Sequence, residues 1–471
     1  MSNTTDLIAH LMRRAGFGAT REEIERLTSL GYERVVEELL DPDTNGVAPF
    51  DESIMFRHQP GFEIPGGNPT TGQCNWMYRM IVTPRPLEEK MTLFWHHVFA
   101  TGNSKVDNCD QLLAQTSMLR KHSLGNYRTL LVNLAKDPAM IFWLDNNQNH
   151  KDAPNENWGR ELLELFTMGQ GHYTEDDVKM ASRAFTGWNI APKIPRLPYG
   201  RFPWEFEYIS EDHDDGEKIF LGNTGRFNGE DIIDIILQQP ATSQFLSRHL
   251  YNFFVADEVQ VPSWLDIAPK DPSAIEILSD ACVSSNYDMQ SVLRTLFNSD
   301  FFKDESVWYS KVKSPAEVVA GTMRLVGDFV EPKPYMAPIG LEPNYQGQAL
   351  LDPPSVEGWH TGQEWIDSGS LVRRINFVAD RVGDVNLPGV QAIIDRLAAK
   401  GNLSASDLID NCLELMGPVK VNQTTFDELI AHAETRGLTL SEISGFDKAE
   451  FAQRVGEILQ LVASTREYQF A

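Results

Sequence analysis

The segment PNENWGRELLELFTMGQGHYTEDDVKMASRAFT, residues 154–186, shows the pattern that decides the fold. Its apolar residues recur at helical spacing over 157–168 and again over 174–186. Thr174 is a suitable N-cap for the second helix, and Asp177 follows at the third helical position, near the positive end of the helix dipole. The segment therefore predicts two helices joined by a short loop.

The same periodicity extends along most of the chain, so we expect a mainly α protein with a large multi-helix body. It recurs at residues 76–100, 110–143, 229–256, 273–302 and 388–466. Residues 202–208 instead alternate between apolar and polar side chains, and a second short apolar run follows at 218–222. Such alternation is typical of strands, and we predict a small β-hairpin inserted near 200–222.

The expected organisation has three parts. Residues 1–330 form the main helical body and contain most of the motifs. Residues 331–370 hold six prolines followed by Trp359 and Trp365. Proline at this density excludes a long helix and tryptophan favours burial, so we expect an ordered loop packed on the body. Residues 371–471 are predicted to be a helical region integral to the same fold.

The charge of the chain excludes several functional classes. Lys and Arg number 41 against 67 Asp and Glu among 471 residues, a net charge of −26 with neutral histidines. This acidity argues against nucleic-acid partners and anionic membrane surfaces. No apolar run is long enough to span a membrane. No signal peptide is visible, because the apolar stretch that should follow Arg13–Arg14 is missing, and we expect a cytoplasmic protein.

The first candidate site is the loop of residues 145–156. Asp145, Asn147 and Asn149 stand at positions 1, 3 and 5, and Glu156 stands at position 12. This is the ligand spacing of a helix–loop–helix calcium site, although His150 replaces the glycine expected at position 6. The alternative is an Asn-rich turn whose amides bond to the backbone.

The second candidate is the helix that follows this loop. Glu161 and Glu164 are three residues apart, so they share one helix face with room for a cation between them. Arg160 can reach Glu156 or Glu164 along the helix, and an ion-pair network around Arg160 is the alternative interpretation.

Two histidine motifs complete the candidates. His96 and His97 lie in an aromatic helical segment, where one of them could be a ligand or a general base. The alternative is a buried structural histidine that bonds to a backbone carbonyl. His213 lies among acidic residues at 211–215, in the turn of the predicted hairpin. These carboxylates could bind a cation or raise the pKa of the histidine, or form a solvated acidic turn.

Several common catalytic motifs are missing from the sequence. It contains no G-x-S-x-G, no Walker loop, no G-x-G-x-x-G after a strand and no H-E-x-x-H. Its four cysteines form no C-x-x-C pair. We therefore expect no nucleotide or flavin cofactor and no zinc finger.

The chain resembles the bacterial family known as domain of unknown function 1800. Segments that carry the resemblance are HLMRRAGFG (10–18), FWHHVFATG (94–102), DPAM (137–140), PNENWGRELLELF (154–166), GHYTEDDV (171–178), AFTGW (184–188), HD (213–214) with Lys218 and LG (221–222), KSP (313–315) and EGW (357–359). Similar proteins commonly carry a second histidine at the position of Val98. Many of them look exported. The resemblance implies a fold and a site but no reaction.

Together these patterns predict a polar pocket within a helical body. His96, Glu161 and His213 are the expected catalytic residues, and a divalent cation, calcium or a transition metal, would be held by Asp145, Asn147, Asn149, Glu156 and Glu164. A metal-dependent hydrolase is the leading expectation and a metal-dependent oxidoreductase the second. The rival is a non-enzymatic, calcium-stabilised binding or scaffold protein whose aromatic loops contact a partner. The substrate or protein partner and the oligomeric state do not follow from the sequence.

Overall fold

The computed structural model describes residues 2–58, 68–191, 204–333, 336–401, 403–435 and 448–471, and confirms a mainly α fold. Helices of the N-terminal third are α1 (Ser2–Ala15), α2 (Arg21–Leu30), α3 (Tyr32–Leu40), α4 (Glu52–His58), α5 (Pro69–Val82), α6 (Pro86–Val98), α7 (Asn103–Val106), α8 (Cys109–His122), α9 (Tyr127–Ala135) and α10 (Pro138–Trp143). Those of the middle third are α11 (Asn157–Glu161), α12 (Glu175–Ala184), α13 (Gly229–Leu237), α14 (Pro240–Phe254), α15 (Pro272–Ser284), α16 (Met289–Asn298), α17 (Asp300–Lys303) and α18 (Pro315–Val326).

The C-terminal third is also helical. Its helices are α19 (Ala337–Tyr345), α20 (Ser368–Val382), α21 (Pro388–Ala398), α22 (Ala405–Leu415), α23 (Gln423–Thr435), α24 (Lys448–Ser464) and α25 (Arg466–Gln469). Short 3-10 turns are η2 (Asn146–Gln148), η4 (Ser210–Asp212), η5 (Val261–Leu265), η6 (Glu305–Val307) and η7 (Gly362–Ile366). A π-helix, η3 (Leu162–Thr167), continues α11 directly.

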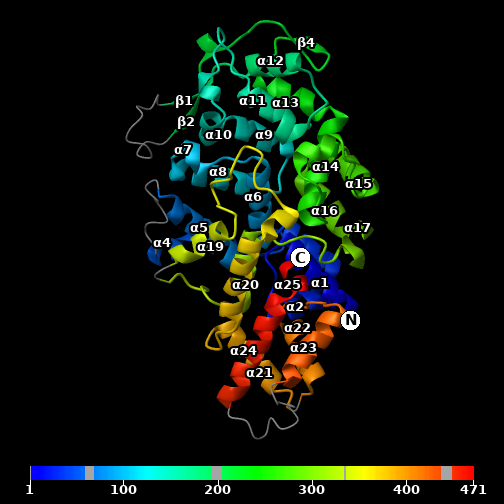
Figure 1. Ribbon diagram of the computed structural model, residues 1–471. Coiled ribbons are helices and arrows are strands. Elements are labelled where there is room, and N and C mark those ends of the chain that lie inside the picture. The colour runs from blue at the N-terminus through cyan, green and yellow to red at the C-terminus, as the bar shows by residue number, and fades with distance from the viewer. Residues whose placement is uncertain (1, 59–67, 192–203, 334–335, 402, 436–447) are drawn as a thin grey trace.

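The molecule is elongated, and the order of the chain is not the order in space. Helices α9 to α13 lie towards one end, α21 to α24 lie at the other, and α1 lies between them near α25 (Figure 1). The C-terminus lies near the middle of the long axis, and the N-terminus lies closer to the end that carries α21 to α24. Residues of α1 and α25 line the same cavity.

Local sequence signals explain where many helices begin. Thr20 and Thr174 accept hydrogen bonds from the third backbone N–H of α2 and α12, and the acidic residue at that third position bonds back to the cap. Ser314 does the same for α18, whose first turn begins with Pro315. A proline costs little there because its missing N–H would have no partner inside the helix.

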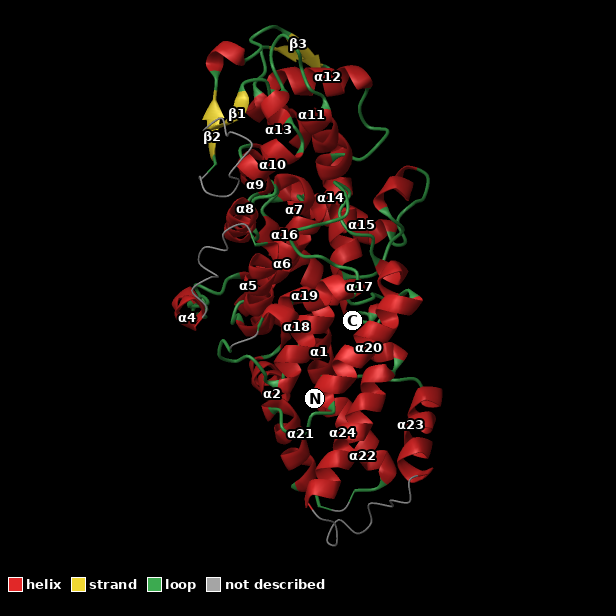
Figure 2. Cartoon of the chain, turned by 60° about the vertical axis from the view of Figure 1, so that its left-hand side comes forward, coloured by secondary structure: helices red, strands yellow, loops and turns green. Residues whose placement is uncertain are grey.

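The strands form two small antiparallel sheets at the end of the molecule that carries α12 (Figure 2). Strand β1 (Trp188–Ala191) pairs with β2 (Glu205–Tyr208), and β3 (Lys218–Phe220) pairs with β4 (Asn223–Gly225). Both runs predicted as strands are present, but they do not pair with each other. Leu221 and Gly222, with φ of 45° and 79°, form a tight two-residue turn that closes β3 onto β4.

Buried side chains form two large clusters that divide the molecule between them. One cluster contains α1 to α3, α6 and the helices from α8 to α17. The other contains α5, α18 and the helices from α20 onwards, so the end of the chain shares its core with residues far earlier in the sequence.

The proline-rich stretch 331–370 is not entirely loop. Residues 337–345 form helix α19, with Pro338 in its first turn, where proline disturbs a helix least, and Pro343 inside the helix. Trp359 and Trp365, 3% and 5% exposed, pack with Val312 in a small cluster of their own. None of the described helices has the length and apolar character needed to cross a membrane.

Candidate functional site

The site is built around the junction between α11 and the π-helix η3. Leu162, Leu163, Leu165 and Phe166 are buried, which leaves Glu161 and Glu164 half-buried on another side. The wider π-helical turn is closed by hydrogen bonds from the N–H groups of Met168 and Gly169 to the carbonyl of Leu163. Such π-helical turns are uncommon and occur often at functional sites.

Glu161 has an unusual proton affinity. Burial raises its pKa, and the neighbouring carboxylates of Glu164 and Glu357 raise it further. Arg160 acts in the opposite direction, but the pKa of Glu161 still reaches about 7. Near neutral pH this carboxyl therefore exists as a mixture of protonated and ionised forms.

The neighbours of Glu161 are held by other groups. Arg160 donates to Glu156 at 3.1 Å and to Glu175 at 2.6 and 2.9 Å. The predicted ion pair between Arg160 and Glu156 thus forms. Glu164 accepts a hydrogen bond from the Tyr173 hydroxyl at 2.9 Å and another from the Gln170 amide.

Glu357 reaches this group from the segment EGW, residues 357–359. Gly358 has a φ of +84°, and a Cβ atom there would lie 2.5 Å from the backbone oxygen of His97. Only glycine fits this close approach. Trp359 stacks on His97 with 6.2 Å between ring centroids and lies 5.4 Å from the ring of His96. The EGW segment therefore joins the carboxylates to the two-histidine motif.

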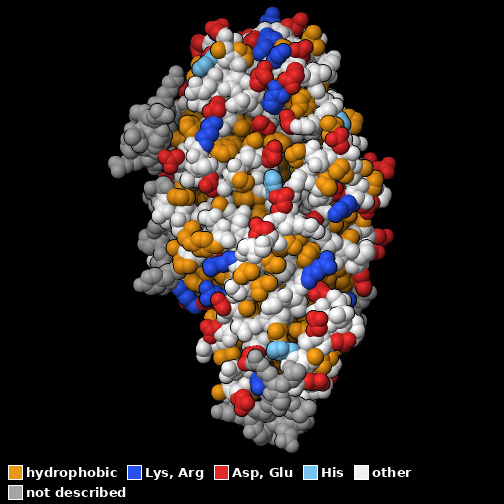
Figure 3. All heavy atoms as spheres, in the orientation of Figure 1, with side chains coloured by type: hydrophobic (Ala, Val, Ile, Leu, Met, Phe, Trp, Pro, Cys, Tyr) orange, Lys and Arg blue, Asp and Glu red, His pale blue; other side chains and the backbone are white. Residues whose placement is uncertain are grey.

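A cleft of about 980 Å³ opens beside these residues. Glu164 and Glu357 are part of its wall, together with residues from α14, α15 and η5. Side chains that line it are, among others, Leu165, Gln170, Gln238, Gln244, Phe245, Arg248, Trp264, Leu265, Ile275, Glu276, Asp280 and Tyr287. The face in Figure 3 carries many Asp and Glu side chains, with Lys and Arg interspersed rather than gathered in one large patch.

The cleft wall carries little unpaired positive charge. Arg248 is the cation among the described lining residues, and it donates to the buried Glu258 at 2.8 and 3.3 Å. Against it stand Glu164, Glu276 and Glu357. The cleft therefore suits neutral or cationic molecules better than anions.

His96 lies next to this region but inside the protein. Its side chain is 0% exposed, and neither ring nitrogen has a hydrogen-bond partner among the described residues. The ring packs edge-on against Trp76. Burial, followed by the charge of His97, lowers the pKa of His96 to about 3, so the ring is neutral. The carbonyl partner expected for a buried structural histidine is missing, and His96 is not among the residues that line the cleft.

A further histidine beside His97, His249 on α14, was not indicated by the sequence pattern. Burial and then the charges of His97 and Arg248 together lower its pKa to about 3. Burial, with Lys311, lowers that of His97 to about 4. His249 packs between Phe245 and Trp264, at centroid distances of 4.6 and 4.7 Å. Both rings are neutral at physiological pH.

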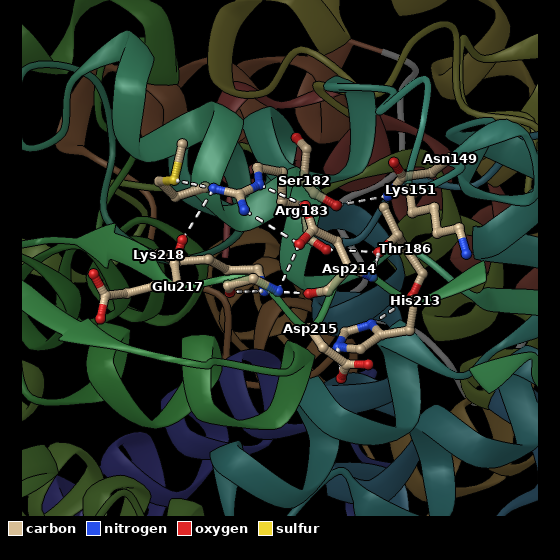
Figure 4. A network of polar contacts seen from close by, with 12 residues as sticks. Asn149, Lys151, Ser182, Arg183, Thr186, His213, Asp214, Asp215, Glu217 and Lys218 are labelled. Atoms are coloured by element: carbon tan, nitrogen blue, oxygen red, sulfur yellow. Dashed lines mark hydrogen bonds and ion pairs between the residues drawn. The ribbon is translucent and has the colours of Figure 1, made fainter. Parts of the chain in front are cut away.

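His213 lies in a different polar network, shown in Figure 4. Its Nδ1 bonds to the carbonyl of Thr186 at 2.9 Å, and the N–H of Asp214 donates to the Thr186 hydroxyl at 2.8 Å. Arg183 on α12 donates to both oxygens of Asp214, at 2.6 and 3.2 Å. These bonds fasten the turn before β3 onto α12. No described contact joins His213 to Glu161, so its catalytic role remains a prediction.

The oxygen atoms of the loop 145–156 point to separate partners. Asp145 accepts from Lys105 at 2.8 Å, and the Asn149 side-chain oxygen accepts from the N–H of Asn155 at 2.9 Å. Glu156 pairs with Arg160. The side-chain oxygen of Asn147 is buried without a described partner. This arrangement matches the alternative of an Asn-rich turn.

Among the described residues, no group of three or more His, Cys, Asp or Glu side chains is placed to hold a metal ion. The structure brings Glu161 and Glu164 together and adds Glu357. It does not bring the loop oxygens at 145–156 into this group. In the sequence, Glu357 was noted only as part of the EGW motif that carries the family resemblance. Glu161 and Glu357 are 196 positions apart, and no periodic pattern links residues at that distance.

Comparison with known proteins gives one match. The family model described as "Protein of unknown function (DUF1800)" matches residues 10–470, nearly the whole chain. No curated protein and no solved structure matches the chain.

Proposed function

Because the chain belongs to the family described as "Protein of unknown function (DUF1800)", whose description names no reaction, we propose a function from its own residues. The protein is a hydrolase in which acid–base chemistry is performed by Glu164 and Glu357, which line the cleft, and by Glu161, which is their neighbour but is not itself a lining residue. The observation that supports this most strongly is the pKa of Glu161, raised to about 7 by burial and by the two neighbouring carboxylates.

A carboxyl group with this proton affinity can act in hydrolysis both as a proton donor and as a proton acceptor. A leaving group needs a proton, and attacking water must lose one; a group whose pKa lies near the working pH can give or take a proton readily. In the proposed reaction the water oxygen bonds to the electrophilic atom of the substrate, and its proton passes to an ionised carboxylate of the group. Glu161 then protonates the leaving atom as the scissile bond breaks.

Glu164 is the second functional carboxylate in this scheme. The Tyr173 hydroxyl, at 2.9 Å, and the Gln170 amide donate hydrogen bonds to it and fix its orientation. Two carboxyl groups in different environments, one protonated and one ionised, are a common division of labour in hydrolases.

The cleft supplies the remaining part of the proposal. Its wall combines aromatic side chains such as Phe245 and Tyr287 with the amides of Gln238 and Gln244. Apolar walls with a few polar groups are typical of small-molecule sites. Because its arginine is already paired with Glu258, the substrate is a neutral or cationic ester, amide or glycoside rather than a phosphate ester.

Metal-dependent hydrolysis is the second form of this proposal. Glu164 and Glu357 both raise the pKa of Glu161, but no three such side chains among the described residues are placed to hold a metal ion, so a cation would have to draw these carboxylates together. A divalent cation, calcium or a transition metal, would be held by these carboxylates and would polarise a substrate oxygen or activate water. A redox metal there would give the oxidoreductase alternative. Calcium with no free coordination position would give the non-enzymatic scaffold.

The test compares the full chain with Glu161→Gln and with Glu428→Gln, an exposed carboxylate on α23. Each is screened against chromogenic esters, amides and glycosides across pH 5–9, with and without added divalent metal. We expect activity in the wild type and in Glu428→Gln, with a pH limb near 7, and a loss of at least 100-fold in Glu161→Gln. Equal activity of wild type and Glu161→Gln would refute the proposal.

Metal analysis of the same preparations separates the two forms. Stoichiometric metal in the wild type that is lost in Glu161→Gln would support the metal-dependent form. A metal-independent activity that still requires Glu161 would support acid–base catalysis by the protein alone.

A further inference from the structure

The centre of the molecule, where α1 meets the segment before α18, has a charge balance unlike that of the whole chain. Arg14 and Arg374 are 1% and 0% exposed, and Arg13 and Lys313 are half-buried. None of the four forms an ion pair with a described residue. In a protein with a net charge of −26, such a group of unpaired cations requires an explanation.

These four cations bond to neutral acceptors. Arg13 donates to the carbonyl of Gly417 at 3.0 Å, and Lys313 donates to that of Tyr468 at 2.6 Å. The guanidinium of Arg14 donates to the carbonyl of Val307 at 2.9 Å. That of Arg374 donates to the carbonyl of Lys313 at 2.8 Å. Carbonyl oxygens solvate a cation but do not cancel its charge.

The carboxylates near these cations, the buried Glu317 and the half-buried Asp257, are already engaged. Glu317 accepts from the buried Lys90, and Asp257 accepts from Lys311 at 3.2 Å. Burial and then the charges of Arg13 and Arg374 together lower the pKa of Lys313 to about 7. The region thus holds an excess of positive charge, and burying such an excess is unfavourable unless an anion compensates it.

A cavity of about 70 Å³ lies against two of these cations, Arg13 and Lys313. Arg13, Lys313 and Arg324 line it, and the Nε atoms of both arginines are buried without a described partner; Arg324 also donates from Nη2 to Glu23 at 2.9 Å. Tyr309, whose ring lies 4.9 Å from the Arg13 guanidinium, forms another part of the wall. The volume is several times that needed for one water molecule, so a five-atom oxyanion fits.

Two acidic side chains, Glu317 and Glu467, line the cavity; Lys90 already engages Glu317, so Glu467 restricts the choice of anion. Glu467 lines the cavity, and its Oε1 accepts from the amide of Asn422 at 2.8 Å. Its Oε2 is buried without a described partner. An ionised carboxylate only accepts hydrogen bonds, so it repels a fully deprotonated anion and favours one that still carries a proton.

We propose that this cavity binds a protonated tetrahedral oxyanion, of which inorganic phosphate is the simplest, between Arg13, Lys313 and Arg324, with Glu467 accepting the proton of the anion. The site is formed by the segments 10–18 and 313–315 and by the C-terminal residues. It is separate from the cleft beside Glu161, and its occupation does not depend on the reaction proposed there.

The experiment measures the binding of radiolabelled inorganic phosphate to the full chain by equilibrium dialysis at constant ionic strength. Unlabelled phosphate, sulfate and chloride are the competitors. We expect saturable binding of one phosphate per chain, competition by sulfate at least tenfold weaker than by phosphate, and no specific competition by chloride. Arg13→Gln and Lys313→Met should raise the dissociation constant at least tenfold, and Glu467→Gln should bring sulfate close to phosphate.

The matched control is Arg396→Gln, which removes a half-buried arginine that is paired with Glu25 at 2.9 Å and does not line this cavity, and it should bind phosphate as the wild type does. Lys313→Met removes an unpaired buried charge, so its Tm without phosphate should equal or exceed that of the wild type. Its Tm should no longer rise when phosphate is added, because a ligand bound only by the folded state stabilises it.

Absence of saturable phosphate binding by the wild type would overturn the proposal. Wild-type affinity in both Arg13→Gln and Lys313→Met would do the same. Sulfate competition as strong as that of phosphate in the wild type would overturn the role of Glu467.

Discussion

Replacing Glu161 by glutamine should remove the pH dependence that this residue gives to the free energy of unfolding. The unfolded chain binds a proton at this position with a pKa near 4.5, and the folded chain with a pKa of about 7. The folded state therefore binds more protons between these values, and its stability falls as the pH rises. The contribution of Glu161 is fully present below pH 4.5 and is lost as the pH passes 7.

The magnitude follows from the size of this change in proton affinity. At about 1.4 kcal/mol per tenfold change in affinity, the rise from 4.5 to about 7 corresponds to about 3 kcal/mol. Glu161 is half-buried, and solvent screening reduces this to about 2 kcal/mol. Glutamine has nearly the same shape and never ionises, so Glu161→Gln should match the wild type near pH 4.5 and exceed it by about 2 kcal/mol at pH 8.

The assay is urea denaturation of wild type, Glu161→Gln and Glu428→Gln at pH 5 and pH 8. The relevant quantity is the difference between each variant and the wild type, because other groups with shifted pKa values change the stability of all three proteins together. Glu428 is exposed, so its variant should follow the wild type at both pH values. A Glu161→Gln variant less stable than the wild type at pH 8 would refute the electrostatic reasoning.

Three further predictions concern other parts of the structure. Asp137 is 8% exposed, and burial raises its pKa to about 7. Asp137→Asn keeps the cap of α10 and should raise the free energy of unfolding at pH 8 by about 2 kcal/mol. Near pH 4 the free energy should be unchanged, and denaturant titration measures both values. By the same measurement, Gly358→Ala should lower the free energy of unfolding by about 3 kcal/mol. Gly222→Ala, with a similar φ but open space around it, should lower it by about 1 kcal/mol, and equal losses would contradict the close approach seen at Gly358. Asp214→Asn breaks the two-bond ion pair with α12 and should cost about 1–2 kcal/mol, while Asp176→Asn, in an exposed pair, should leave Tm unchanged in thermal denaturation.

Helical periodicity was sufficient to predict the fold class. The caps at Thr20, Thr174 and Ser314 act on residues three positions away, so their signals are visible in the sequence. Strand pairing was harder, because the turn at Leu221–Gly222 places a leucine at positive φ, a conformation that its residue type does not indicate. Residues 331–370 contained a helix that the density of prolines obscured.

The candidate site was predictable only where its residues are neighbours in sequence. Glu161 and Glu164 share a helix turn and were found by their spacing. Glu357 reaches them through the fold, and spacing contains no information about such a contact. His96 and His213 carry the right chemistry in the sequence, but the structure surrounds one with aromatic rings and uses the other to hold a turn. The oxygens at 145–156 have the spacing of a calcium site in the sequence, but in the structure they bond to separate partners.

The central claim is that Glu161 holds a proton near neutral pH beside the cleft. Infrared difference spectroscopy of the full chain, titrated from pH 4 to pH 9 with Glu161→Gln as the reference, follows the protonated carboxyl of this residue directly. We expect an infrared signal of the protonated Glu161 carboxyl that disappears with a midpoint near pH 7 and is missing from Glu161→Gln. A midpoint near the ordinary glutamate value of 4.5 would contradict this claim.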